Sequence, residues 1–243
     1  MESSRAWSDR AADHFRRSDG GATELERHVA LAARALAEGD HRQVSRLCAE
    51  GTNRWPSTVG TEEYWNLAGL LVHGAAREKA FTIGLQIRPH WPWAFFVRGM
   101  AREEQGRNDE AIADYDRAIA IYPRFPEARS NRAGLRRIRN DLDGAITDLT
   151  AAVGARPSFA IARHNRAQAW QAKGDFTRAL ADVDEAIRHE PAMMQSRILR
   201  GELRQRDGNV AGAIEDYEAA LPYTEPGSRI RNDLERWLAE LRK

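Results

Sequence analysis

Three segments of the sequence decide the fold: AIADYDRAIAIYP at residues 111–123, AITDLTAAVGARP at 145–157 and ALADVDEAIRHEP at 179–191. Each begins with Ala, carries Asp three residues later and ends in Pro, and successive segments start 34 residues apart. A fixed period of this length is typical of stacked helical hairpins, in which each repeat contacts mainly its neighbours. The sequence therefore predicts an array of helical repeats.

Other positions share this period and divide each repeat into two helices. Gly or Asn fits a left-handed turn at a helix end, small residues let two helices approach closely, and Pro stops the second helix. The turn positions are Gly106, Asn140, Gly174 and Gly208; the small positions are Gly99, Ala133, Ala167 and Gly201, then Ala118, Ala152, Ala186 and Ala220; the prolines are Pro89, Pro123, Pro157 and Pro191.

These sets, together with Tyr115 and Tyr217, resemble the tetratricopeptide repeat family over about nine tenths of the chain. The resemblance implies an all-α fold: a right-handed superhelical solenoid of helix-turn-helix repeats with a C-terminal capping helix. The chain departs from the family at one position, because the family's common Trp near the start of each unit is replaced by Phe95, Arg129, Arg163 and Arg197.

The expected segments follow one another without a second domain. Residues 1–22 form an N-terminal arm, either mobile or an extra helix; 23–91 hold two degenerate repeats; 92–227 hold four clear repeats; and 228–243 form the capping helix. A solenoid needs such a cap to cover its last apolar face. In the cap one stripe combines Ile230, Leu234, Trp237, Leu238 and Leu241.

The overall composition excludes several classes of protein. Lys and Arg number 37 against 36 Asp and Glu, and 42% of residues are hydrophobic, which argues against a nucleic-acid binder and against a disordered tail. No apolar run is long enough to span a bilayer, and the N-terminus lacks a secretory h-region. A single cysteine, Cys48, excludes a disulfide framework and favours a buried structural thiol. We expect a cytoplasmic protein with no membrane or nucleic-acid partner.

Part of the charge is also periodic. An Arg lies eight residues before each turn position and an Asp eight residues after it, so in an antiparallel hairpin both lie about 12 Å from the turn. We expect four structural ion pairs, within each repeat or shared with the next: Arg98 with Asp114, Arg132 with Asp148, Arg166 with Asp182, and Arg200 with Asp216. The alternative is that these arginines bind an acidic ligand.

In this family the first helices line a concave groove, and the groove side is opposite the periodic Arg. Its candidate partner-binding residues are Trp93, Phe96, Met100, Asn131, Arg137, His164, Asn165, Gln168, Gln171 and Gln205. The early part is apolar and the later part is rich in amides, which can donate to and accept from a peptide backbone. Asn131 and Asn165 resemble the asparagine ladder in the repeats of O-linked N-acetylglucosamine transferase. The alternative is that the amides are ordinary solvated side chains and that the aromatic residues pack against a neighbouring repeat.

No catalytic motif stands out: the sequence has no P-loop, no dinucleotide-binding glycines, no GxSxG and no close pair of metal-ligating histidines. We therefore expect no catalytic residue, metal or cofactor, and favour a scaffold that binds an extended peptide or a partner helix. Two alternatives stay open. One is a regulatory module that binds a small molecule or signal peptide; the other, less favoured, is an enzyme with its polar centre near His164.

Overall fold

The computed structural model describes residues 74–87 and 89–243, together with His28, Leu31, Ala35, Gln43, Arg46, Leu47 and Glu50. The arm at 1–22, Cys48 and most of the degenerate repeats at 23–91 lie outside these residues. The chain divides into two compact units, Met1–Pro123 and Arg124–Lys243. In the first, the helices are α5 (Gly74–Ile87), α6 (Pro92–Glu104) and α7 (Asn108–Ile121).

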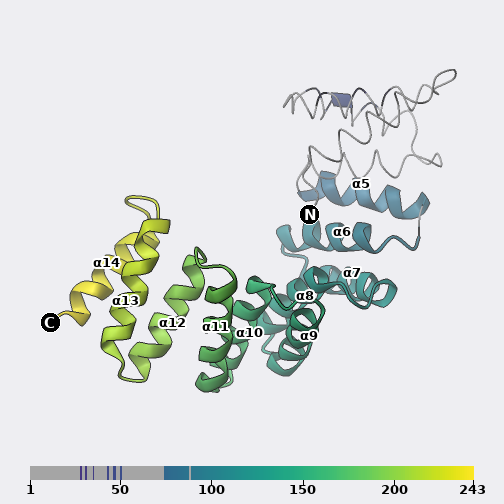
Figure 1. Cartoon of the computed structure of the whole chain (residues 1–243). Coiled ribbons are helices and arrows are strands. Elements are labelled where there is room, and N and C mark those ends of the chain that lie inside the picture. Colours follow the sequence, from purple (N-terminus) through teal and green to yellow (C-terminus); the bar gives the residue numbers. More distant parts are fainter. Residues whose placement is uncertain are drawn as a thin grey trace. The chain divides into compact units, whose positions relative to one another are not determined.

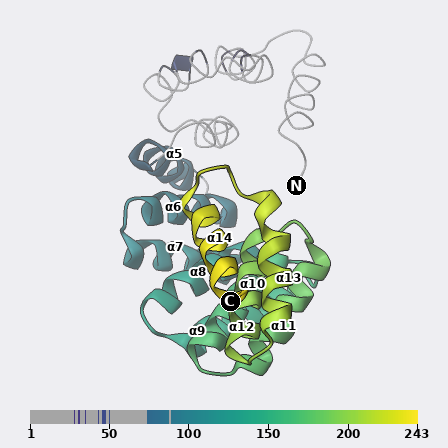
Figure 2. The ribbon, with the colours of Figure 1, turned by 90° about the vertical axis from the view of Figure 1, so that its left-hand side faces the viewer.

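The second unit continues the same alternation of first and second helices (Figures 1 and 2). Its elements are α8 (Pro126–Ile138), α9 (Leu142–Ala155), α10 (Ala160–Ala172), α11 (Phe176–His189), α12 (Met194–Arg206), α13 (Val210–Ala220), the 3-10 turn η1 (Leu221–Tyr223) and α14 (Arg229–Leu241). The hairpins α6–α7, α8–α9, α10–α11 and α12–α13 each pack as a pair. These helices confirm the all-α repeat fold that the 34-residue period predicts.

The turn between the two helices of each hairpin requires a left-handed residue. Gly106, Gly174 and Gly208 have φ of 74°, 81° and 80°, and Asn140 takes the same conformation at 62°. Glycine adopts this region without steric cost, and asparagine tolerates it better than other side chains. The periodic Gly or Asn is thus explained by backbone geometry.

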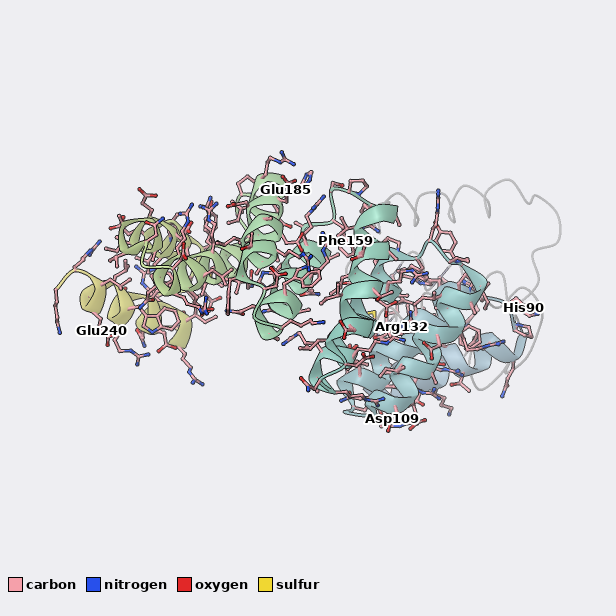
Figure 3. The ribbon with its side chains drawn as sticks, turned by 90° about the horizontal axis from the view of Figure 1, so that it is seen from below. His90, Asp109, Arg132, Phe159, Glu185 and Glu240 are labelled. Carbon is pink, nitrogen blue, oxygen red and sulfur yellow. The ribbon has the colours of Figure 1, made fainter. Side chains whose placement is uncertain are left out.

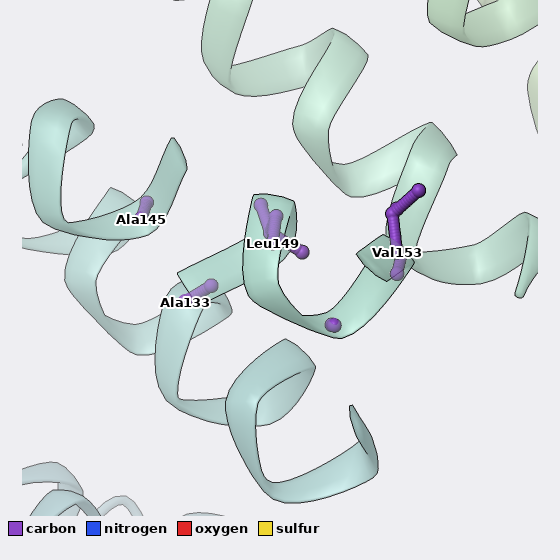
Figure 4. Close-up of a cluster of buried hydrophobic side chains, with 6 residues drawn as sticks. Ala133, Ala145, Leu149 and Val153 are labelled. Atoms are coloured by element: carbon purple, nitrogen blue, oxygen red, sulfur yellow. The ribbon is translucent and has the colours of Figure 1, made fainter. Parts of the chain in front are cut away.

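Small residues at the helix crossings allow close packing inside each repeat. In the second unit one buried cluster joins α8, α9 and α10 through Ala133, Ala145, Leu149, Ala152, Val153 and Ala162 (Figure 4). Alanines at the crossings bring the helix backbones together, and the larger Leu149 and Val153 fill the space beside them. The core therefore alternates small and large residues along the array.

The periodic arginines and aspartates are paired inside each repeat. Arg98 donates from Nε and Nη2 to the two Asp114 oxygens at 2.9 and 2.6 Å, and Arg166 makes the same pair of bonds to Asp182, both at 2.7 Å. The side chains of the second unit, Arg132 among them, are drawn in Figure 3. The remaining two pairs have the same bidentate form: Arg132 with Asp148 and Arg200 with Asp216.

A second arginine lies within hydrogen-bond distance of three of the four aspartates. Arg102, Arg136 and Arg204, one helical turn after the periodic Arg, lie 2.9, 3.0 and 2.9 Å from the Asp of their own repeat. In the α10–α11 repeat, which holds Asp182, the equivalent position is Trp170. Its ring lies under the guanidinium of Arg178. The aspartates are buried, so each needs this compensation for lost hydration.

The periodic arginines also reach back to the preceding second helix. Arg166 donates to Thr150 Oγ1 at 3.1 Å, and Arg200 pairs with Asp184 at 2.7 Å. One guanidinium therefore links the second helices of two consecutive repeats, in addition to its own hairpin. This contact supports repeat stacking with a side chain that is planar and always charged.

The C-terminal helix α14 covers the last repeat of the second unit. Leu234 and Leu238 are buried in one cluster with Ala213, Tyr217 and Ala220 of α13, and Trp237 and Leu241 pack against its edge. The Trp237 ring lies 5.5 Å from that of Tyr217. Ile230, expected on the same stripe, is 46% exposed because it lies in the first turn of α14.

Candidate functional site

The candidate residues lie on the first helices of the repeats. We define the first-helix face as the positions two and five residues before and after each periodic Arg. Because that Arg is bonded to the second helix, helical geometry turns these positions to the other side. On α8, α10 and α12 the face comprises Glu127, Ser130, Gly134 and Arg137; Ile161, His164, Gln168 and Gln171; and Gln195, Ile198, Glu202 and Gln205.

The aromatic part of the face belongs to the first unit. Trp93 lies 5.4 Å from Phe96, and Phe96 lies 6.0 Å from Tyr115 of α7, measured between ring centres. Phe96 is buried, whereas Trp93 and Met100 are half-buried. The aromatic residues are therefore mainly core side chains, and Trp93 and Met100 present the accessible apolar surface of α6.

Several polar residues of the second unit connect one first helix to the next. Asn165 Nδ2 donates to Ser130 Oγ at 3.3 Å, which links α10 to α8. His164 Nδ1 and Ser196 Oγ share a hydrogen bond of 3.2 Å, which links α10 to α12. Both serines are buried. Asn131, the other member of the predicted asparagine pair, is half-buried on α8.

The imidazole of His164 is buried, and its surroundings oppose a positive charge. Burial, together with the nearby Arg137 guanidinium, lowers the pKa of His164 to about 4. The ring is therefore neutral near pH 7 and acts as a hydrogen-bonding partner of Ser196. Arg137 itself is exposed at the end of α8.

A second polar cluster lies where α10, α12 and α13 meet. Gln171 hydrogen-bonds to the Glu202 carboxyl group, and partial burial raises the pKa of that carboxyl group against the effect of this bond. The Tyr217 hydroxyl donates to Gln205 Oε1 at 3.2 Å. Burial and the neighbouring Glu202 carboxylate raise the pKa of Tyr217 to about 12, so it keeps its proton as a donor.

Two groups of the predicted residues come together in the structure. Arg137 lies near His164. Gln171 and Gln205 belong to one cluster, in which Gln171 bonds to Glu202 and Gln205 bonds to Tyr217. Gln168 is half-buried on α10. The partners that sequence reasoning missed are Ser196 and Glu202. Ser196 carries a weak signal, since the two preceding repeats have Ala128 and Ala162 at the equivalent position.

The described residues offer no evident metal or membrane chemistry. No three of their His, Cys, Asp or Glu side chains gather in a way that could hold a metal ion. None of the helices within this part of the chain is both long enough and apolar enough to cross a membrane.

Comparison with known families finds one match. The family model described as "Tetratricopeptide repeat" matches residues 96–160 and 164–228, more than half of the chain. Comparison with the curated proteins finds no match.

Solved structures share the fold at low sequence identity. The type IV pilus biogenesis factor PilW has a TM-score of 0.72 and 18% identity, over 88% of this chain and 100% of that one. The APC/C hetero-tetramer Cut9–Hcn1 has a TM-score of 0.77 and 12% identity, over 99% of this chain but only 46% of that one. TTC0263, a thermophilic repeat protein of Thermus thermophilus, has a TM-score of 0.59 and 19% identity, over 73% and 99%. Identities this low show a common fold alone.

Proposed function

The chain belongs to the tetratricopeptide repeat family, and from that membership we propose that it is a protein-interaction scaffold. In this proposal the first-helix face holds an extended segment of a partner protein. Stacked repeats present a long continuous surface, which suits a linear ligand better than a small enclosed one. Membership in a family does not by itself fix a function, so the proposal depends on the chemistry of the face.

The observation that carries the proposal is a segregation of charge in the second unit. The strong charges of the repeats are paired on the side of the second helices, as in Arg166 with Asp182 and Arg200 with Asp216. The first-helix face on the opposite side carries mainly uncharged polar groups, among them Gln168, Gln171 and Gln205. A peptide backbone offers alternating donors and acceptors without net charge, and side-chain amides complement both.

Neither alternative function gains a specific observation. As the polar centre of an enzyme, His164 would have to exchange protons with a substrate, but its ring is buried and already bonded to Ser196. For a small-molecule regulator, the described residues offer no observation beyond those that already support peptide binding. We therefore propose peptide binding alone.

The proposal is tested by selecting linear peptides from a random display library on the purified protein. The double variant Gln168→Ala/Gln171→Ala removes two amides from α10 and should weaken the selected peptides roughly thirtyfold, since each hydrogen bond contributes ~1 kcal/mol and about 1.4 kcal/mol is tenfold in affinity. Asn232→Ala, which removes an exposed amide from α14, is the matched control and should bind as the unmodified chain does. Equal affinity in the Gln variant and the control would place any binding elsewhere.

A second variant, Asn131→Ala/Asn165→Ala, tests the predicted asparagine pair. Its thermal unfolding must be measured in parallel, because Asn165 also bonds to Ser130. Weaker peptide binding at an unchanged melting temperature would support direct contact with the peptide. If binding and stability fell together, the pair would be structural.

A further inference from the structure

Two opposite charges on the first-helix face of the second unit form no ion pair with any described residue. They are Arg137 at the end of α8 and Glu202 on α12, and both residues are exposed. The other acidic group of the face, Glu127, is paired with Arg156. The face is thus neutral overall but carries one positive and one negative site that remain to be compensated.

The unpaired state of Glu202 is notable because a basic residue stands one helical turn away. Arg206 has the spacing that allows an ion pair along a helix. Its guanidinium instead lies over the Phe176 ring, 3.2 Å from the ring centre. The side chain that hydrogen-bonds to the Glu202 carboxyl group is the neutral Gln171. Its carboxylate is therefore held in place while its charge stays available to a ligand.

The surface between the two charges carries no charge of its own. The middle helix, α10, contributes Ile161, His164, Gln168 and Gln171 to the face. Burial and the Arg137 guanidinium lower the pKa of His164 to about 4, so this residue is also neutral near pH 7. A ligand that crosses from α8 to α12 would meet a positive site, a neutral polar stretch and a negative site, in that order.

The spacing of the charges sets the length of the ligand between them. Packed helices lie 8–10 Å apart, so two steps from α8 through α10 to α12 amount to roughly 20 Å. An extended chain advances about 3.3 Å per residue, so roughly six residues span this distance.

We propose that the second unit selects linear peptides in which an acidic side chain faces Arg137 and a basic side chain, about six residues away, faces Glu202. This inference rests on the proposed peptide-binding function and adds a charge pattern to it. Complementary charges fix the register of the ligand and exclude wrong partners more than they add affinity.

The test uses charge reversals that change which peptides are selected. Random linear peptides are displayed to the unmodified chain, to Arg137→Glu and to Glu202→Arg, and the enriched sequences are read. The controls are Arg188→Glu on α11 and Glu215→Arg on α13, which reverse exposed charges on second helices. Circular dichroism melts confirm that all five proteins are folded to the same extent.

Three results are expected. The unmodified chain and both controls enrich peptides with one acidic and one basic residue about six positions apart. Arg137→Glu enriches peptides with two basic residues, and Glu202→Arg enriches peptides with two acidic residues. Each reversal weakens the peptides selected on the unmodified chain by about fivefold, with a smaller effect at high salt.

The failure of this inference differs from the failure of the proposed function. Peptides enriched on all five proteins with the same charge composition would overturn the charge pattern and leave peptide binding intact. No enrichment on any of them would overturn peptide binding, and the inference with it.

Discussion

Gly201 on α12 lies directly against the ring of Tyr217 on α13: a methyl group at Gly201 would stand 2.4 Å from Tyr217 Cε1. The first unit repeats this relationship, since a methyl group at Gly99 would lie 2.7 Å from Tyr115 Cε1. The two repeats between them have Ala133 and Ala167 at the glycine position, with Leu149 and Val183 at the tyrosine position. Where the second helix carries the large Tyr, the first helix has Gly; where the second helix carries the smaller Leu or Val, the first helix has Ala.

This compensation in size predicts that Gly201→Ala destabilises the fold. Tyr217 is 1% exposed and cannot move into solvent, so overpacking should lower the free energy of unfolding by about 1–3 kcal/mol. Tyr217→Leu should cost less in the Gly201→Ala background than alone, because Ala133 and Leu149 already coexist in another repeat. Urea denaturation of the four proteins gives the coupling, and strictly additive costs would contradict it.

Gly134→Ala is the matched control for that substitution. Gly134 also lies on a first helix, but a methyl group there would meet no atom within 4 Å. Alanine is the better helix former by about 1 kcal/mol, so this variant should be equally stable or slightly more stable than the unmodified chain.

The 34-residue period predicts the hairpins and the paired charges because each of these features lies within a single repeat. Arg200 and Asp216 lie at equal heights on the two helices of a hairpin, and the position of one turn is enough to derive this. The contact between His164 and Ser196 joins the first helices of two repeats. Whether the first helices of two repeats touch depends on the rotation from one repeat to the next. Placing residues around the axis of a single helix gives no information on that rotation. Phe96, predicted on the groove side, is buried and lies against Tyr115 of its own hairpin, so the helical projection misplaces this ring.

The number of arginines around each aspartate predicts which Asp→Ala substitution destabilises the fold more. Asp148 accepts from Arg132 and also lies 3.0 Å from Arg136 and 3.3 Å from Arg129. Asp182 has Arg166 at 2.7 Å and Arg163 only at 3.9 Å. Removing a buried partner costs ~3 kcal/mol, and Asp148→Ala should exceed this value while Asp182→Ala falls near or below it. Thermal melts measure both.

Asp143→Ala is the control for these two variants. Asp143 pairs with Lys173 at the surface, where its side chain is 85% exposed. Such a pair contributes less than ~1 kcal/mol, so the melting temperature should barely change. Equal losses in all three variants would mean that burial of the aspartates has no bearing on stability.

The cap predicts a contrast between two apolar residues of α14. Leu234 is 0% exposed and Ile230 is 46% exposed. Leu234→Ala should lower the free energy of unfolding by about 2–5 kcal/mol, because it leaves a cavity against α13. Ile230→Ala should change it by less than ~0.5 kcal/mol. Similar costs at the two positions would show that α14 does not pack on α13 as described.

The buried imidazole of His164 predicts a loss of stability in acid. Its pKa is lowered to about 4 in the folded chain, against 6.5 for an ordinary histidine. Between these values the unfolded chain binds more protons, so the free energy of unfolding falls as the pH falls through this window. At 1.36 kcal/mol per pKa unit, the contribution reaches at most about 3 kcal/mol.

His164→Gln should flatten the dependence of the free energy of unfolding on pH between pH 6.5 and 4, measured by urea denaturation. His90→Gln, which removes an exposed histidine (Figure 3), should leave this dependence unchanged. Parallel profiles for His164→Gln and the unmodified chain would mean that water reaches the ring and that the His164–Ser196 contact is open in solution.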